Sequence, residues 1–91
     1  MTDVSPALSE TGAPSERDYE TLDVRELPPP GPLTETLERL AALDESLVLV
    51  QLNDRAPQHL YPQLDERGYD HETVPADDVV LTAIWREETQ A

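Results

Sequence analysis

Apolar residues along the chain recur with the period of a helix in two places. Between positions 33 and 41, four of them share the spacing of one helix face and predict a helix that ends near residue 43. A second pair, Leu60 and Leu64, lies four residues apart and predicts another helix, with Gly68 just past its C-terminal end. The first set is Leu33, Leu37, Leu40 and Ala41.

Four other segments predict strands. Residues 46–52 (SLVLVQL) form a nearly continuous apolar run, typical of a central buried strand. Residues 79–86 (VVLTAIWR) are apolar on both faces, whereas residues 69–74 are polar and predict a strand near a sheet edge. Residues 19–25 (YETLDVR) supply the first strand, and residues 75–78 predict a turn. The predicted order is therefore βαβαββ.

Prolines mark the limits of both predicted helices. The segment 27–32 (LPPPGP) favours polyproline or turn geometry, and Pro32 suits the first helical position because proline has no N–H to satisfy there. Glu35 then falls in the first turn, where its charge complements the helix dipole. Pro62 lies inside the second predicted helix and predicts either a kink or a short segment that ends before it.

Residues 1–18 lack any apolar period and are rich in Ser, Thr, Pro, Gly and acidic residues. Such a segment buries too little apolar surface to offset its ordering entropy, so we predict a disordered acidic tail, with folding on binding as the alternative. The domain then spans residues 19–88, and residues 89–91 fray. No apolar run approaches the roughly 20 residues of a membrane span, and residues 1–10 lack the pattern of a secretory signal.

The charge of the chain restricts its environment and its partners. Twenty acidic residues face six basic ones, all arginine, and the formal net charge is -14. Self-repulsion at this charge opposes a compact state, but molar salt shortens the Debye length to about 3 Å and screens it. Together with the absence of lysine and phenylalanine, this composition favours the high-salt cytoplasm of an extreme halophile; an acidic mesophilic protein is the alternative. Without a basic stripe, neither nucleic acid nor an anionic membrane is an expected partner.

Several classes of chemistry are excluded by the residues present. The chain has no cysteine, which excludes disulfides, iron–sulfur clusters, thiol nucleophiles and persulfide carriage. Its two histidines, His59 and His71, lack a metal-binding spacing, and its paired carboxylates fall on predicted outer faces or turns. We therefore expect no metal, no cofactor and no catalytic residue, and hence a non-enzymatic protein.

Short motifs in a fixed order link the sequence to a known family. The first strand ends in an Asp-x-Arg, prolines precede the first helix, and Asn-Asp followed by a proline and a leucine comes after the second strand. Over residues 21–86 the chain resembles domain-of-unknown-function family twenty-two forty-nine, in a halophilic archaeal form. That family is a relative of the TusA/SirA-type sulfur carriers. The motif residues are Asp23, Arg25, Pro30, Pro32, Asn53, Asp54, Pro57 and Leu60.

The resemblance implies an α/β (α+β) two-layer sandwich, TusA/SirA-like, in which a four-stranded mixed sheet carries two helices on one face. Parallel pairing of the first two strands needs a helical crossover, which agrees with this fold. In the sulfur carriers a Cys-Pro-x-Pro motif at the mouth of the first helix carries the persulfide; here Pro29 occupies the cysteine position. Such domains are also found beside or fused to hemerythrin-like proteins and proteins of respiratory or nitrogen-oxide metabolism.

The mouth of the first helix is one candidate ligand site. Backbone N–H groups of the first helical turn, with Arg25 as an anchor, could hold a carboxylate or a phosphate group. In the alternative, Arg25 pairs with Asp23 or Glu26 and braces the junction between strand and helix. The candidate ligand-binding residues are Asp23, Arg25, Leu33, Thr34, Asn53 and Asp54.

The sheet face without helices is the second candidate. Two helices cover one face only, so the other side of strand 79–86 would form an apolar patch, and such patches mark interaction surfaces. Alternatively, the N-terminal tail folds across it, or the patch stays a modest exposed area. Our leading hypothesis is an accessory protein that meets a protein partner or a second copy through this face; a small-molecule or anion-binding regulator is the alternative. The expected surface residues are Val79, Leu81, Ala83 and Trp85.

Overall fold

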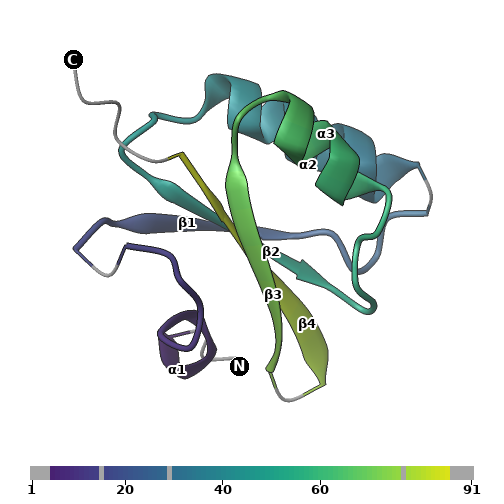
Figure 1. The fold of residues 1–91 in the computed structure, drawn as a ribbon. Coiled ribbons are helices and arrows are strands. Elements are labelled where there is room, and N and C mark those ends of the chain that lie inside the picture. Colours follow the sequence, from purple (N-terminus) through teal and green to yellow (C-terminus); the bar gives the residue numbers. More distant parts are fainter. Residues whose placement is uncertain (1–4, 15, 29, 77, 87–91) are drawn as a thin grey trace.

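Seven elements follow the chain in the computed structural model, which describes residues 5–14, 16–28, 30–76 and 78–86 (Figure 1). A short helix precedes the predicted βαβαββ order. The elements are α1 (Ser5–Leu8), β1 (Tyr19–Asp23), α2 (Gly31–Ala42), β2 (Val48–Asn53), α3 (Leu60–Glu66), β3 (Asp70–Ala76) and β4 (Val79–Trp85).

The four strands form one mixed sheet in the order β1-β2-β4-β3. β1 runs parallel to β2, with α2 as the crossover that such a pair requires, and the other two pairings are antiparallel. Figure 1 shows α2 and α3 together on one face of the sheet and α1 on the other. The predicted fold class, a four-stranded mixed sheet layered with helices, is confirmed.

Side-chain alternation along the strands sorts the apolar residues into two clusters, one on each face of the sheet. Leu49 of β2 and Ile84 of β4 point toward the helices, while their neighbours along each strand point away. The cluster between sheet and helices consists of Leu22, Val24, Leu40, Leu49, Leu60, Leu64 and Ile84.

Helix α2 begins one residue earlier than the sequence predicts. Pro30 is its N-cap and Gly31 its first residue, and the Gly31 N–H donates to the Pro28 carbonyl oxygen at 2.7 Å. The earlier start moves Glu35 out of the first turn, so its expected interaction with the helix dipole is not realised.

Helix α3 resolves the question that Pro62 raised. The helix starts at Leu60, three residues beyond Pro57, which places Pro62 in the first turn. An N–H at that position has no acceptor within the helix, so the proline fits without a kink. At the other end Gly68 adopts φ +78°, and the Tyr69 N–H closes back onto the Leu64 carbonyl oxygen at 3.0 Å, as the predicted C-terminal glycine requires.

Strand β3 is longer than predicted. It continues through Pro75 and Ala76, where the sequence suggested a turn, and Pro75 lies opposite Val80 of β4. The proline is tolerated because β3 is an edge strand, as expected, and needs a partner on only one side. The predicted frayed end, residues 89–91, lies outside the described residues.

Candidate functional site

Apolar side chains crowd the sheet face opposite α2 and α3. We call it the helix-free face because neither of the two helices predicted from the sequence lies on it; among the described residues, only the short α1 does (Figure 1). The four residues expected to form an exposed patch lie on this face, as the strand periodicity predicts. They are not exposed, however: Leu81 and Ala83 are 0% accessible, Val79 3% and Trp85 9%. The helix-free face consists of Val48, Val50 and Leu52 on β2, Val74 and Ala76 on β3, and Val79, Leu81, Ala83 and Trp85 on β4.

The N-terminal segment covers part of this face. We call residues 5–14 the cover; they include α1, which lies against β3 and β4. Ala7 is buried in the cluster, and Leu8 and Ala13 pack on it. The described part of residues 1–18 therefore lies across this face, which is the alternative considered for it, rather than forming the disordered acidic tail expected there. The physical reason is that the helix-free face is apolar enough to bind even a segment that contributes three small or medium apolar side chains.

Polar contacts also hold the N-terminal segment to the domain. The Gly12 N–H donates to Glu72 Oε1 on β3 at 2.8 Å, and Arg17 Nη1 donates to the carbonyl oxygen of Arg86. A Cβ atom at Gly12 would come within 3.3 Å of Glu72 Oε1 and 3.9 Å of the Trp85 ring. The cover thus passes closely over Trp85.

The cover leaves a hollow on its β1 side. This space of about 740 Å³ lies between the N-terminal segment and the start of β1 and β2. α1 lies over β3 and β4, and the β2 residues of the face, Val48, Val50 and Leu52, are buried as well. The hollow is lined by Leu8, Ser9, Thr11, Ala13, Pro14, Arg17, Asp18, Tyr19 and Val48.

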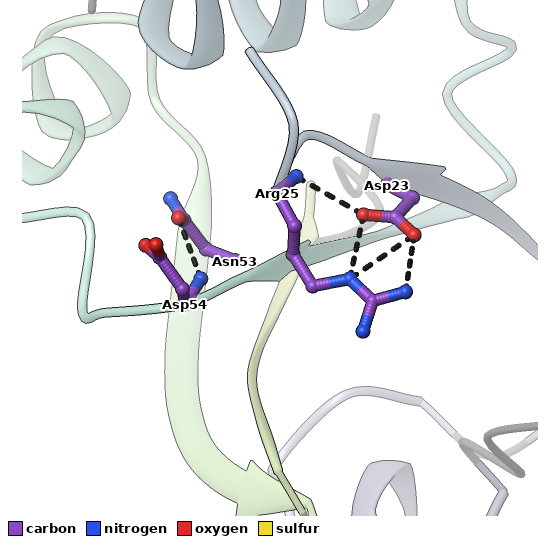
Figure 2. A network of polar contacts seen from close by, with 4 residues as sticks. All are labelled: Asp23, Arg25, Asn53 and Asp54. Carbon is purple, nitrogen blue, oxygen red and sulfur yellow. Dashed lines mark hydrogen bonds and ion pairs between the residues drawn. The ribbon is translucent and has the colours of Figure 1, made fainter. Parts of the chain in front are cut away.

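At the mouth of α2 the structure brings together four of the predicted ligand-binding residues, at the carboxyl ends of the parallel strands β1 and β2 (Figure 2). Figure 2 shows the Arg25 guanidinium turned toward Asp23. Arg25 Nη2 donates to Asp23 Oδ2 at 2.7 Å and Nε to Oδ1 at 3.0 Å, and the Arg25 N–H also donates to Oδ1 at 3.0 Å. This is the strand-bracing alternative considered for Arg25.

Asp23 and Arg25 each stabilise the charged form of the other. The hydrogen bond from the Arg25 side chain lowers the pKa of Asp23, and the hydrogen bond to Asp23 raises the pKa of Arg25. Asp78 and Glu26 add to the negative field at the guanidinium. A ligand anion would therefore compete with a bidentate carboxylate and face two further negative charges.

The N–H donors that an anion would need are also engaged. The Gly31 N–H donates to Pro28 and the Thr34 N–H to Pro30, while Pro32 has none. Three of the first four positions of α2 thus offer no N–H to a ligand. The Leu33 side chain is half-buried against the helix-side core, Thr34 is exposed, and Asn53, which is buried, uses its Oδ1 to accept the Asp54 N–H at 2.7 Å.

Titration of Asp23 tests this pairing. We expect its carboxyl to titrate below the ordinary aspartate value of about 3.9, and Arg25→Gln to return it to that range. Since the folded pKa is lowered, the stabilisation that this carboxylate provides is present above the unfolded value and lost as the pH falls through the folded value. Carboxyl ¹³C NMR measures both. Arg55→Gln, which changes another exposed arginine, should leave Asp23 unaffected; ordinary titration of Asp23 in the wild type would contradict the pairing.

A buried polar row between sheet and helices was not anticipated. Gln51 in β2 is fully buried; its Nε2 donates to Thr36 Oγ1 at 2.8 Å, while its Oε1 has no hydrogen-bond partner. Thr36 Oγ1 in turn donates to the Pro32 carbonyl oxygen at 2.7 Å. Thr73 joins Thr82 and the Tyr61 hydroxyl nearby. The one signal in the sequence is a glutamine inside the apolar run 46–52.

The two histidines stay apart. His71 on β3 stacks on Tyr61 with ring centroids 4.7 Å apart, and its Nε2 lies 3.2 Å from Asp65 Oδ1. His59 is the exposed N-cap of α3. Within the part of the chain that the structure describes, no three His, Asp or Glu side chains gather as a metal site would require.

The four-stranded mixed sheet with α2 and α3 on one face (Figure 1) places the protein in the class of small α+β domains, and four of the motif residues lie together at the mouth of α2 (Figure 2). The chain belongs to the family of uncharacterised conserved proteins DUF2249, whose model matches residues 21–86. Neither the curated proteins nor the solved structures contain a significant match. Among the described residues, no helix has the length and apolar character needed to cross a membrane. The cover, residues 5–14, lies outside the segment that the family model matches.

Proposed function

We propose that this protein is a non-enzymatic protein-interaction module that uses the helix-free face to bind a protein partner or a second copy. The observation that carries the proposal is an apolar face of nine side chains closed by a thin N-terminal segment. An apolar sheet face of this extent on a small domain needs a cover, and apolar patches are the usual interaction surfaces of soluble proteins. In this chain the cover comes from outside the matched family segment.

The cellular setting is part of the same proposal. We place the protein in the high-salt cytoplasm of a halophile, because of its charge of -14 and its lack of lysine. A TusA/SirA-like ancestry agrees with the βαβαββ order after α1 and with the parallel β1–β2 pair. Persulfide carriage is outside its chemistry because it has no cysteine. Respiratory or nitrogen-oxide metabolism is the process we propose for its partner.

Salt should stabilise the fold. Most carboxylates of the described residues are exposed to solvent. Raising KCl from about 0.1 M to about 1 M shortens the Debye length from about 10 Å to about 3 Å and so screens the repulsion between them. We expect the free energy of unfolding to rise by at least about 1 kcal/mol, equivalent to about 4–8 °C in melting temperature. Thermal circular dichroism in both buffers measures this. An unchanged transition would count against the halophile setting.

The interaction itself is tested by affinity capture from lysate of the source organism at its native salt concentration. Val74→Asp places a charge on the helix-free face, where Val74 is half-buried. Thr34→Asp adds the same charge at an exposed position on α2 and serves as the matched control. We expect the wild type and Thr34→Asp to retain one common protein that Val74→Asp loses, with all three baits folded by circular dichroism. Equal retention by all three baits would remove the helix-free face from consideration.

A further inference from the structure

We propose that the cover regulates the helix-free face, and that the partner segment replacing it is an amphipathic helix with basic residues beside its apolar side. This inference rests on the proposed function, since it names the regulation and the partner chemistry of that surface. The cover then acts in cis as a weak stand-in for the partner.

The cover is built to be displaced. Its helix α1 has four residues, far fewer than the roughly 12–15 at which an isolated helix becomes even marginally stable in water. Its apolar contribution is limited to Ala7, Leu8 and Ala13, against nine apolar residues of the helix-free face. Its hydrogen bond to β3 joins a backbone N–H to the side chain of an exposed residue, Glu72. The hollow on the β1 side borders the helix-free face at Val48 and leaves room beside the cover.

The shape of the covered site favours a helical occupant. α1 already lies across β3 and β4 as a helix, with Ala7 buried beneath it. A longer helix could follow the same path and extend toward the hollow of about 740 Å³. Recognition of an amphipathic helix by an apolar groove is a common mode of peptide binding.

Charge at the borders favours a basic occupant. By strand alternation, Asp70 and Glu72 project to the same side of β3 as Val74 and Ala76, and both acidic residues are exposed. Asp18 lines the hollow at the opposite border, and Arg17, which also lines it, is engaged with the Arg86 carbonyl oxygen. Lysine or arginine flanking the apolar side of a helix would meet these carboxylates, whereas a second copy would bring the same acidic borders against them.

The fraction of molecules with an open cover determines how tightly a partner binds. A partner binds only the fraction of molecules whose face is open, so its apparent affinity falls in proportion to that fraction. Fixing the cover in place should abolish binding, and loosening it should strengthen binding without a new contact.

A single engineered disulfide makes this test in the full-length chain. Because the protein has no cysteine, Gly12→Cys with Glu72→Cys creates one possible intramolecular pair. A Cβ at Gly12 lies 3.3 Å from Glu72 Oε1, the end of the Glu72 side chain, so closing the disulfide draws the two backbones together. Mass spectrometry and a free-thiol assay confirm the bond before binding is measured. The probe is a synthetic peptide of about 18 residues with leucine and lysine at helical spacing, and a peptide of the same composition in scrambled order is the control. Fluorescence anisotropy measures affinity before and after reduction.

Release of the lock should restore binding. We expect the reduced protein to bind the helical peptide at least about tenfold more tightly than the oxidised protein, with no such difference for the scrambled peptide. Ala7→Glu, which places a charge beneath α1 without any disulfide, should strengthen binding relative to the wild type. Light scattering should show monomers in every form.

Three results would overturn the inference. Equal binding by the oxidised and reduced proteins would reject the regulatory cover and leave the proposed function intact. Binding of the helical and scrambled peptides with equal affinity would reject the basic amphipathic helix as the occupant. Dimers that form on reduction would identify a second copy as the occupant instead. Failure of the proposed function itself is seen separately, as equal capture by the wild type and Val74→Asp.

Discussion

Replacing Gln51 by glutamate is expected to destabilise the fold by about 4 kcal/mol at neutral pH, because it buries an unpaired carboxylate. Gln51 is fully inaccessible, and Thr36 Oγ1 is the partner of its amide. That hydroxyl already donates its proton to the Pro32 carbonyl oxygen, so it cannot also donate to a new carboxylate. A carboxylate at this position would therefore lack the hydrogen-bond donor from Thr36 that could stabilise its charge.

The pH dependence of the Gln51→Glu variant identifies the cause. Burial raises the folded pKa of the new carboxyl above its unfolded value of about 4.3. The destabilisation is therefore absent below the unfolded pKa and grows as the pH rises toward the folded pKa. Urea unfolding of variant and wild type at about pH 4 and about pH 7 in molar KCl gives the difference at each pH. Similar differences at both pH values would contradict a buried charge as the cause.

Gln51→Leu is the matched control for the same position. It removes the amide whose Oε1 has no hydrogen-bond partner, and it leaves the Thr36 hydroxyl bonded to Pro32. We expect this variant to be neutral or more stable by up to about 1 kcal/mol, because the loss of one hydrogen bond is offset by removal of an unsatisfied polar atom. A large loss of stability would mean that the amide has a role beyond its hydrogen bond to Thr36.

Leu81→Ala is expected to destabilise the fold by about 2–5 kcal/mol. Leu81 lies at the centre of the helix-free face and is 0% accessible. The substitution removes buried methyl groups and leaves a cavity that the paired strands β2 and β3 on either side cannot close. For a chain of this size, whose stability is about 5–14 kcal/mol at typical values per residue, this is a large fraction of the total.

Leu27→Ala provides the comparison. Leu27 is 39% exposed, so its truncation should change the free energy of unfolding by less than about 1 kcal/mol. Chemical denaturation of both variants in molar KCl measures the two values. If Leu81→Ala were no more harmful than Leu27→Ala, the helix-free face would not be part of the packed core, and its cover would be open most of the time.

Much of the fold follows from the sequence because the domain is built from strong local patterns. The apolar run 46–52 and the alternation in β4 determine which residues share a face, and both agree with the structure. Where element limits differ, tertiary context is responsible. Pro75 remains in a strand because β3 lies at the edge of the sheet; the sequence predicts the edge position, but not that the strand continues through the proline to pair with β4.

The candidate sites were predicted less completely. The sequence places Asp23 and Arg25 two residues apart, so their pairing is a local event that it anticipates as an alternative. Contacts between distant segments are different. The bond from Gly12 to Glu72 spans sixty positions, and the sequence gives folding of segment 1–18 across the sheet only as an alternative, without indicating that Ala7 is the residue buried there. The apolar excess of β4 signals only that some cover is needed.

Acrylamide quenching of Trp85 reports directly on whether the cover opens, because this single tryptophan lies on the helix-free face beside Gly12. The protein with Gly12→Cys and Glu72→Cys is compared in its oxidised and reduced forms, with and without the helical leucine–lysine peptide. We expect weak quenching when the cover is locked, stronger quenching after reduction, and renewed protection when the peptide binds. Quenching that is equal in both forms and unaffected by the peptide would contradict the claim that this face is an interaction surface under a removable cover.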